Sequence, residues 1–492
     1  MNTNKKAVVI GAGIAGIAAA IRLRKLGFEV VVFESAATYG GKIKEYLWNG
    51  FRFDTGPSLF TLPELVDELF ELCDKNPRDY YTYKTLKSIT RYFYEDGIVI
   101  NSYSNPIEFA NEVVEKTKVD SNVVLSFLKK QAKTYRLLAP IFLENPIHII
   151  GKLLKISNIP ALIHVANPSF LLSMNKVNAA WFKNKYLVRL FNRYGTYNGS
   201  NPYTMPSLFN IISHLEHNVG AYLPEKGIRS IADSLYKLAM EEGVVFQFNS
   251  FVDNINVNHK KTDGIKAKGI DYQADIVVSN MDVNNTYSQL LGQTNAPKMY
   301  LQNQKSTSAL IFHWAVKGNF EALDVHNILF AKNYEEEFEY LFHKMEMYHD
   351  PTIYIYISSK TVANDAPVGF ENWFVMVNTP HLGDFNLDVE ATRKSIQNKI
   401  KNYLKIDIEP LIQNENTITP TDLQNTTHSF LGSLYGASSN NMMSAFLRHP
   451  NFSKVENLYF CGGTVHPGGG IPLSLMSAKI VASLVQESIE KQ

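Results

Sequence analysis

The residues that point most directly to a chemistry are glycines near the start of the chain. Segment 9–16 reads Val-Ile-Gly-Ala-Gly-Ile-Ala-Gly, and a valine-rich run that ends at Glu34 follows it. This order predicts a strand, a glycine turn, a helix and a second strand. Gly11 suits the tight turn, Gly13 lets backbone N–H groups approach a pyrophosphate, and Gly16 lets the helix pack against the strand. The segment therefore predicts binding of the ADP half of a dinucleotide.

Glu34 narrows the choice of dinucleotide. Its carboxylate can accept hydrogen bonds from ribose hydroxyls and would repel a 2′-phosphate, which favours FAD or NAD over NADP. Two other interpretations compete. Lys5 and Lys6 before an apolar stretch are compatible with a secretory signal, and a Gly/Ala-rich helix start is compatible with packing alone. Glu34 follows at the spacing of the nucleotide motif, which favours the nucleotide site.

A second set of glycines favours FAD over NAD. Directly after Glu34 come Gly40-Gly41-Lys42, then Gly50, and then Asp54-Thr55-Gly56-Pro57. Paired glycines allow close backbone approach, and a longer cofactor with a ribityl chain and a flavin ring must pass more backbone than NAD does. An ordinary glycine-rich loop is the alternative interpretation. Together with the first motif, this set predicts FAD.

A third glycine-rich constellation lies near the other end of the chain. Segment 458–464 is typical of a buried strand that enters a glycine turn, 466–472 reads His-Pro-Gly-Gly-Gly-Ile-Pro, and 475–482 is typical of a helix. Strand, glycine loop and helix again place backbone N–H groups at a helix start. This segment is expected to meet the pyrophosphate or the flavin edge.

With these motifs the chain resembles, over essentially its whole length, the bacterial-type FAD-dependent phytoene and carotenoid desaturases, which are amine-oxidase-like flavoproteins. Three middle segments also carry the resemblance, namely 198–202, 220–227 and 274–282. Three departures occur: Lys42 replaces a usual arginine, Val465 a usual threonine and Leu473 a usual glycine. Lysine keeps the charge but not the bidentate fork. These departures, with 193–197 and 432–436, are most similar to the hydroxycarotenoid 3,4-desaturase branch.

The resemblance implies a set of FAD-binding residues, position by position. It assigns no catalytic residue, and we expect no metal ion. The residues implied are Gly11, Gly13, Ile14, Ala15, Gly16, Glu34 and Ser35 for the ADP half; Gly41, Lys42, Gly56, Pro57 and Ser58 for the flavin side; Val252 for the adenine; Asn280 and Met281 over the cofactor; and Gly463, Thr464, Gly470, Ile471 and Pro472 for the closing loop.

Length and composition are compatible with such an enzyme. A chain of 492 residues is long for one core, which predicts two or three interleaved domains. The net charge of +1 gives no electrostatic footprint for nucleic acid, and we expect none as a partner. Cys73 and Cys461 are the only cysteines, which excludes a disulfide framework and indicates a reducing compartment. No window is apolar enough to span a bilayer.

The positions of the motifs predict an α/β fold with a discontinuous, Rossmann-like FAD-binding domain formed by 1–75, 222–284 and 423–492. A mixed β-sheet substrate domain is expected from 76–105 and 285–422, and a helical cap from 106–221. Within the sheet, 91–100 predicts a hairpin with an Asp-Gly two-residue turn. Aromatic and β-branched residues predict strands at 352–357 and 373–377.

The cap is the candidate membrane-docking region. Segments 137–143 and 148–156 are apolar with lysines nearby, and an amphipathic face of this kind can enter the headgroup boundary of a membrane. A plain cap that packs on its own sheet is the alternative. Because the implied carotenoid substrate resides in lipid, we expect a cytoplasmic protein held peripherally at the inner membrane.

The resemblance implies desaturation of a 1-hydroxycarotenoid such as hydroxy-γ-carotene: hydride loss to the flavin and loss of a proton, with oxygen or a quinone as electron acceptor. His466, Tyr435 and Arg448 are candidates for the proton acceptor or for structural roles. Two alternatives stay open. One is a phytoene-type desaturase or another isoprenoid flavin oxidoreductase, and the other is a non-catalytic flavin or isoprenoid carrier.

Overall fold

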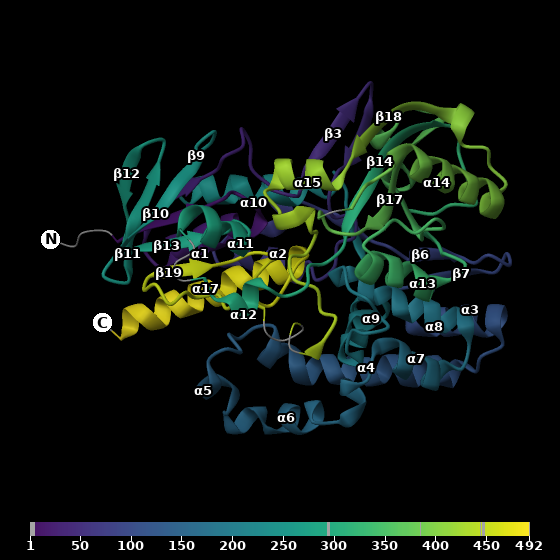
Figure 1. Ribbon diagram of the computed structural model, residues 1–492, viewed down its shortest axis with the longest axis horizontal. Coiled ribbons are helices and arrows are strands. Elements are labelled where there is room, and N and C mark those ends of the chain that lie inside the picture. Colours follow the sequence, from purple (N-terminus) through teal and green to yellow (C-terminus); the bar gives the residue numbers. More distant parts are fainter. Residues whose placement is uncertain (1–4, 293–295, 384, 443, 445–447, 492) are drawn as a thin grey trace.

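A five-stranded parallel sheet forms the centre of one half of the molecule (Figure 1). The computed structural model describes residues 5–292, 296–383, 385–442, 444 and 448–491. The strand order is β19-β13-β1-β2-β9. Its strands come from distant parts of the sequence: β1 (Lys6–Ile10), β2 (Glu29–Phe33), β9 (Val245–Gln247), β13 (Ile276–Ser279) and β19 (Leu458–Phe460).

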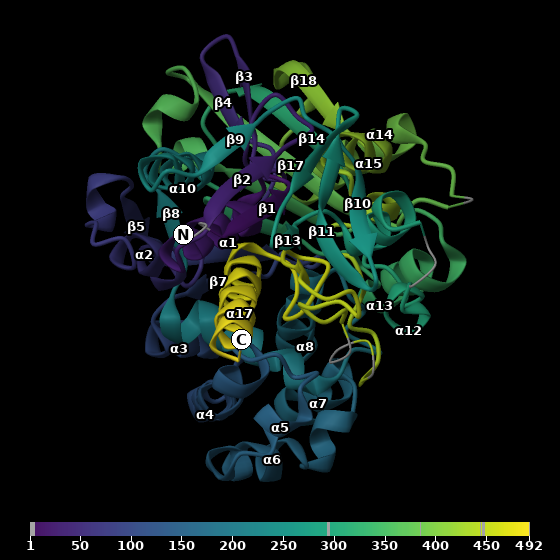
Figure 2. The same cartoon turned by 90° about the vertical axis from the view of Figure 1, so that its left-hand side faces the viewer.

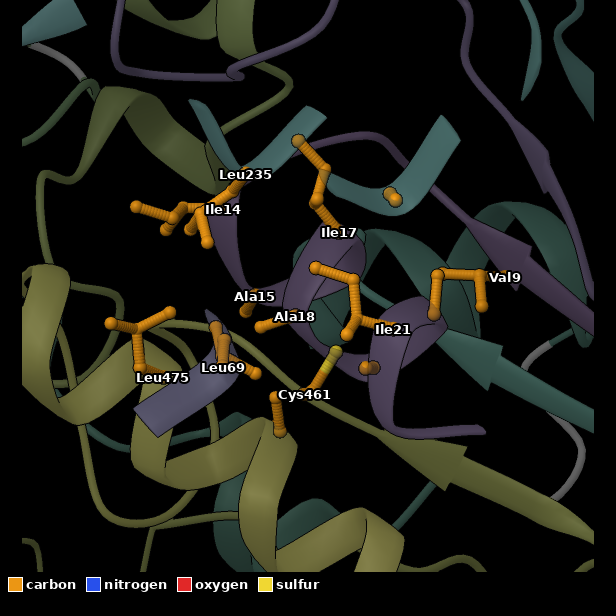
Figure 3. Packing of buried hydrophobic residues seen from close by; sticks show 14 of the residues in the cluster. Val9, Ile14, Ala15, Ile17, Ala18, Ile21, Leu69, Leu235, Cys461 and Leu475 are labelled. Atoms are coloured by element: carbon orange, nitrogen blue, oxygen red, sulfur yellow. The ribbon is translucent and has the colours of Figure 1, made fainter. Parts of the chain in front are cut away.

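Both faces of this sheet are covered, which explains its nearly continuous apolar strands. Ala7 and Val9 of β1 point into a core shared with three helices, α1 (Ile14–Lys25), α10 (Arg229–Glu241) and α17 (Ile471–Glu490). Figure 3 shows this packing around Val9, Ile17, Leu235 and Leu475. Val8 and Ile10 point to the opposite face. An antiparallel sheet covers that face: β10 (Val252–Asn258), β11 (Lys261–Ala267) and β12 (Ile270–Gln273).

A seven-stranded mixed sheet forms the second half of the molecule. Its order is β18-β14-β17-β16-β15-β6-β7, in which β15 and β6 are parallel and the other neighbours antiparallel. One face packs against α14 (Val389–Leu404) through Ile396 and Ile400. The strands are β6 (Ser88–Phe93), β7 (Val99–Tyr103), β14 (Ser308–Lys317), β15 (His326–Leu329), β16 (Ile353–Ile357), β17 (Phe370–Thr379) and β18 (Ile412–Ile418).

A layer of helices lies below the mixed sheet in Figure 1, with α5 and α6 at its outer edge. Within the described residues, no helix combines the length and apolarity needed to cross a bilayer. The helices of the cap are α3 (Pro106–Thr117), α4 (Ser121–Phe142), α5 (Ile150–Leu153), α6 (Ile159–Val165), α7 (Met174–Phe182), α8 (Lys185–Asn192) and α9 (Ile212–His214).

Shorter elements connect these layers. They are β3 (Glu45–Trp48), β4 (Phe51–Asp54), α2 (Glu64–Glu71), β5 (Tyr83–Thr85), β8 (Tyr222–Pro224), α11 (Val283–Asn285), α12 (Lys298–Leu301), α13 (Tyr334–Glu339) and α15 (Pro420–Thr427). The predicted α/β class, with a parallel sheet, a mixed sheet and a helical cap, is confirmed. The domain boundaries stay a prediction.

Two local predictions need correction. The hairpin between β6 and β7 exists, but its turn is not a two-residue Asp-Gly turn. Tyr94 N–H donates to the Ile98 carbonyl at 3.0 Å, so three residues form the loop. Gly97 alone has a positive φ, of 86°, whereas a type I′ turn needs one at Asp96 as well. Helix α17 begins at Ile471, before the predicted 475, because Pro472 in its first turn needs no N–H partner.

A buried carboxyl group links the mixed sheet to its neighbouring helices. Glu337 of α13 is 1% exposed, and its side chain accepts hydrogen bonds from the backbone N–H of Thr352 at 2.9 Å and from its hydroxyl at 2.6 Å. Lys399 of α14 forms an ion pair with Asp350 at 2.8 Å rather than with Glu337. Burial raises the pKa of Glu337 from 4.5 to about 7.

This raised pKa predicts a pH-dependent stability. Between pH 4.5 and about 7 the folded state keeps the Glu337 proton and the unfolded state loses it, so this group's contribution falls as pH rises through that window. Glu337→Gln mimics the protonated acid and therefore removes the pH-dependent contribution of Glu337 to the free energy of unfolding. In the wild type this contribution changes by roughly 3 kcal/mol by pH 7. Urea unfolding midpoints at several pH values measure it. The exposed Glu346→Gln is the control, and equal pH profiles for wild type and Glu337→Gln would refute the prediction.

Candidate functional site

The carboxyl ends of four parallel strands meet at one edge of the first sheet. The register pairs Ile10 with Phe33 and with Ser279, and Ser279 with Phe460. The chain segments that leave these strands are therefore neighbours, although the first and last are about 450 residues apart in sequence. Crevices at the carboxyl edge of such sheets are the usual ligand sites. The predicted residues that follow the strands lie here: Gly11–Gly16, Glu34, Ser35, Asn280, Met281, Gly463 and Thr464.

The two N-terminal glycine segments pack directly on each other. Gly40 N–H donates to the Ala12 carbonyl at 2.8 Å. A Cβ on Gly41 would lie 3.2 Å from the Cα of Gly13, and a Cβ on Gly16 would overlap with the Gly11 carbonyl. The glycines are thus required by backbone contact between the segments, as the sequence predicted for Gly16.

Asn280 joins the first glycine turn to the last strand. Its backbone N–H donates to the Ile10 carbonyl at 2.8 Å, and its side-chain amide donates to the Cys461 carbonyl at 3.1 Å. A Cβ on Gly13 would lie 2.7 Å from the Asn280 Oδ1, and one on Gly462 would lie 2.5 Å from its Nδ2. One amide side chain therefore fills the space between glycines of both chain ends.

Both helices that start in these loops have N-termini without a side-chain cap. Gly13 precedes α1 and Gly470 precedes α17, so neither can supply a capping oxygen. By contrast, Asn105 caps α3 and Asp388 caps α14. The first N–H groups of an uncapped helix lack partners, and together with the helix dipole they favour an anion. Ile14 and Ala15 lie in the first turn of α1, and Ile471 and Pro472 in the first turn of α17.

Glu34 is held in place by neighbouring backbone. Its carboxylate accepts hydrogen bonds from the N–H of Ala12 at 2.7 Å and of Ala36 at 2.8 Å, and from the Ser35 hydroxyl at 3.2 Å. An ionised carboxylate has about four acceptor positions, so one remains for a ligand hydroxyl. The chain around Val252 is adjacent, since Ser250 N–H donates to the Glu34 carbonyl at 2.8 Å.

The loop predicted for the flavin side is also closely packed. A Cβ on Gly56 would overlap with the Lys42 carbonyl, so the segment that continues into Pro57 and Ser58 lies against Lys42. Lys42 is half-buried, and its Nζ donates to the Leu434 carbonyl at 2.7 Å. Burial lowers the pKa of this amine to about 8, with Asp282 opposing the shift. A mostly charged lysine is therefore held inside the protein at neutral pH.

Arg448 positions the closing loop. Its guanidinium is buried and donates to three carbonyls: Tyr435 at 2.8 Å, Ala437 at 2.7 Å and Gly463 at 3.2 Å. Burial lowers the pKa of Arg448 to about 10. Of the two roles considered for this residue, the structure supports the structural one, because its N–H groups are occupied by backbone.

His466 also has a structural environment. The ring is 4% exposed, and its Nε2 lies 3.0 Å from the Asn145 carbonyl, which requires the nitrogen to donate. Burial lowers the pKa of His466 to about 3, with His148 and Arg448 adding to the shift. A neutral ring whose outer nitrogen bonds a carbonyl has no free site there for a proton from substrate.

Two supporting residues escaped the sequence analysis. Asp54 accepts hydrogen bonds at 3.3 Å from the N–H groups of Ile228 and Arg229 at the start of α10. Arg229 in turn donates at 3.0 Å to the carbonyls of Tyr39 and Ile43, on both sides of the Gly40-Gly41 pair. Asp54 stood inside a recognised motif, but nothing in the spacing connected it with Arg229.

Comparisons with known proteins agree with this geometry. The model of the flavin containing amine oxidoreductases matches residues 14–486, and the chain belongs to this family of flavin-dependent oxidoreductases. It is 44% identical, over 98% of its length and 99% of the relative's, to the 1-hydroxycarotenoid 3,4-desaturase of Flavobacterium sp. (strain P99-3). It is 30% identical, with 98% of both chains covered, to the 4,4'-diaponeurosporene oxygenase of Staphylococcus aureus (strain bovine RF122 / ET3-1).

The fold has solved counterparts. A putrescine oxidase bound to putrescine superposes with a TM-score of 0.64, at 14% identity and with 99% of both chains covered. At that identity the likeness concerns the fold alone. The resemblance to amine-oxidase-like flavoproteins, and within them to carotenoid enzymes, is confirmed. The individual cofactor-binding residues stay predictions.

The Gly56 contact generates a test of the flavin-side loop. In Gly56→Ala the new methyl group overlaps with the Lys42 carbonyl and pushes the two segments apart. Such overpacking costs about 1–3 kcal/mol, so we expect flavin affinity to fall roughly 5- to 150-fold. Flavin absorbance per protein, and titration of the apoprotein, measure the loss.

Gly383→Ala is the matched control, because a Cβ there meets nothing within 4 Å. A Gly56→Ala protein that folds and retains wild-type flavin affinity would show that this loop does not contact the cofactor.

Proposed function

We propose that the protein is an FAD-dependent carotenoid desaturase that removes two hydrogens from the C3–C4 bond of a 1-hydroxycarotenoid such as hydroxy-γ-carotene. One observation carries the proposal: the chain is 44% identical to a 1-hydroxycarotenoid 3,4-desaturase over nearly all of both sequences. The site geometry supports it, because two uncapped helix starts and two glycine loops converge on one edge of the sheet.

The cofactor fits the residues in this order. Glu34 and the backbone before Val252 hold the adenosine, and the N-terminus of α1 holds the pyrophosphate. Lys42 with the loop from Gly56 to Ser58 borders the flavin, and the start of α17 closes the site. FAD rather than FMN follows from the adenosine end, where the Glu34 carboxylate has an acceptor position free.

When bound, FAD supplies the hydride acceptor for the reaction. The protein aligns the substrate. The two ionisable side chains considered as acceptors of the substrate proton, Arg448 and His466, are not available for it. Arg448 and His466 are both engaged with backbone carbonyls, so the proton leaves to another group or to water. Oxygen or a membrane quinone is the proposed final electron acceptor, as the sequence analysis expected.

We also propose that the outer edge of the cap docks on a membrane at the cytoplasmic face of the inner membrane. Here the chain exposes a series of large apolar side chains, with Ile156 85% exposed. This 150–172 patch consists of Ile150, Leu154, Ile156, Ile159, Ile163, Leu171 and Leu172. An apolar series of this kind on one edge of a protein matches the surface that enters the headgroup region.

Charge supports the same docking surface. Residues 121–215 contain eleven Lys and Arg but one acidic residue, Glu144, in a chain whose net charge is only +1. Basic residues near an anionic leaflet contribute about 1 kcal/mol each. The cap is thus the part of the chain suited to an anionic lipid surface, and a carotenoid dissolved in that lipid would enter the protein from this side.

The substrate proposal is tested by co-expression in a bacterial host that makes γ-carotene or lycopene, with and without a carotenoid 1-hydratase. We expect a loss of two hydrogens in mass and a red-shifted absorption spectrum only when the hydratase is present, because the hydroxyl is required. Mass spectrometry and absorption of extracted pigments are the measurements. A change without the hydratase would indicate a phytoene-type desaturase. No change with flavin-loaded protein present would favour the carrier.

The docking proposal is tested by sedimentation with vesicles of phosphatidylcholine alone or with anionic phosphatidylglycerol. Ile156→Glu with Ile163→Glu should lower the fraction bound to anionic vesicles at least ~10-fold, since burial of two isoleucines is lost. Val368→Glu is the control, because Val368 is fully exposed outside the patch. Binding equal to wild type in the double variant would contradict the docking surface.

A further inference from the structure

A chain of hydrogen bonds runs from the flavin-side loop into the mixed sheet. The Ser58 hydroxyl lies 2.6 Å from the Tyr354 hydroxyl, which in turn lies 2.7 Å from Nδ1 of His326. The His326 ring is 1% exposed and is stacked against Tyr356 with centroids 5.1 Å apart. Its other nitrogen, Nε2, is buried without a partner in the described part of the chain.

This hydrogen-bonded chain connects the flavin-side loop with the interior of the mixed sheet. Tyr354 is enclosed by protein, so that burial raises its pKa, yet the side chain keeps accessible surface. Lys42 on the flavin-side loop and Tyr435 are likewise partly exposed, and burial lowers the pKa of Lys42 and raises that of Tyr435. A Cβ on Gly469 of the closing loop would lie 2.7 Å from the Tyr435 ring. Tyr354 also packs on the same apolar cluster as Leu59 and Leu434, the neighbours in sequence of Ser58 and Tyr435, so this side chain lies between the flavin-side loop and the segment that contacts the closing loop.

The unpaired nitrogen of His326 sets the direction of the chain. A buried N–H without an acceptor is rarer than an unused acceptor, so we place the ring proton on Nδ1. Nδ1–H then donates to the Tyr354 oxygen, and the Tyr354 hydroxyl donates to the oxygen of Ser58. Ser58 is partly exposed, and its hydroxyl proton is left free to donate to a bound ligand.

The same groups are unsuited to take up a proton. Burial lowers the pKa of His326 to about 3, and the Arg193 guanidinium adds to the shift. Arg193 is itself 7% exposed, where it donates to the hydroxyls of Tyr92 at 3.2 Å and Tyr197 at 3.1 Å. A neutral imidazole beside a fixed positive charge is a poor base near neutral pH. Recognition of a neutral polar group is the role that these contacts permit.

We propose that Ser58, aligned by Tyr354 and His326, donates a hydrogen bond to the tertiary hydroxyl of the carotenoid and so selects hydroxylated substrates. The inference rests on the proposed function, in which the hydroxyl is on C1 and the reacting bond joins C3 to C4. Two C–C bonds and one C–O bond span about 4 Å, so the hydroxyl must lie beside the flavin. Ser58 is two residues beyond Gly56, whose backbone packs on Lys42 in the loop proposed to border the flavin.

The test compares hydroxy-γ-carotene with the same carotenoid carrying hydrogen in place of the hydroxyl, both supplied in vesicles to flavin-loaded enzyme. Ser58→Ala should raise KM and the dissociation constant for the hydroxylated carotenoid roughly 5- to 100-fold, and leave binding of the deoxy compound unchanged. Tyr354→Phe should shift both constants in the same direction by a smaller factor. Flavin content is measured for both variants and should stay at the wild-type value in Tyr354→Phe.

Tyr356→Phe is the matched control, because this tyrosine is two residues along the same strand and its hydroxyl donates to Asp54 at 3.3 Å instead. Equal losses for both carotenoids would show a packing role and overturn the proposal. The proposal would also be overturned if the ratio of dissociation constants for the two carotenoids were the same as in wild type in both Ser58→Ala and Tyr354→Phe. If wild type neither binds nor converts the hydroxylated carotenoid, the proposed function itself fails. If Ser58→Ala loses flavin, the dissociation constants of Tyr354→Phe for the two carotenoids decide between hydroxyl recognition and a packing role.

Discussion

Backbone-to-backbone packing at the carboxyl edge of the parallel sheet is the constraint on which the rest of the molecule depends. Gly13 and Gly41 come from two segments whose backbones approach because neither residue carries a side chain, and the Asn280 amide fills the space between Gly13 and Gly462. The uncapped N-termini of α1 and α17 point to this edge, and Arg448 holds the closing loop next to it. The mixed sheet places polar side chains on the other side of the flavin-side loop. The glycines are therefore structural requirements first, and the ligand site is a consequence of the space that they leave.

Much of the fold was predictable because its signals are local. The nucleotide motif around Gly11, the strands at 353–357 and 370–379 and the helical cap depend on turn chemistry and on apolar patterning, which neighbouring residues reveal. The type of turn between β6 and β7 could not be predicted, because the sequence Asp-Gly is compatible with several turn types. The register of the two strands determines which of them forms. The candidate site divides in the same way. Its glycines could be located, but pairs such as Asp54 with Arg229 or Ser58 with Tyr354 are brought together only by the tertiary fold.

The cap and the mixed sheet offer the proposed substrate two different environments, an apolar one and a polar one. The cap carries the 150–172 patch at its outer edge and an excess of basic residues within 121–215, which suits an apolar molecule that arrives from lipid. Polar side chains lie at the interior end, among them the buried Arg193 and His326 and the partly exposed Tyr354. Exposed apolar side chains and buried polar side chains each lower the stability of the folded protein. The presence of both in one molecule distinguishes this arrangement from an ordinary α/β core.

The position of β19 at the edge of the parallel sheet has a consequence for biosynthesis. Its partner β13 is made some 180 residues earlier, and β1 about 450 residues earlier. At about 5–20 residues per second, the ribosome needs roughly 20–90 s between the first strand and the last. For the last 180 or so residues of that interval, roughly 9–36 s, β13 has an unpaired edge and the α17 side of the core is missing. Nascent chains thus keep the edge of β13 unpaired until β19 has been made, so the pairing of these two strands, rather than the first motif, completes the parallel sheet.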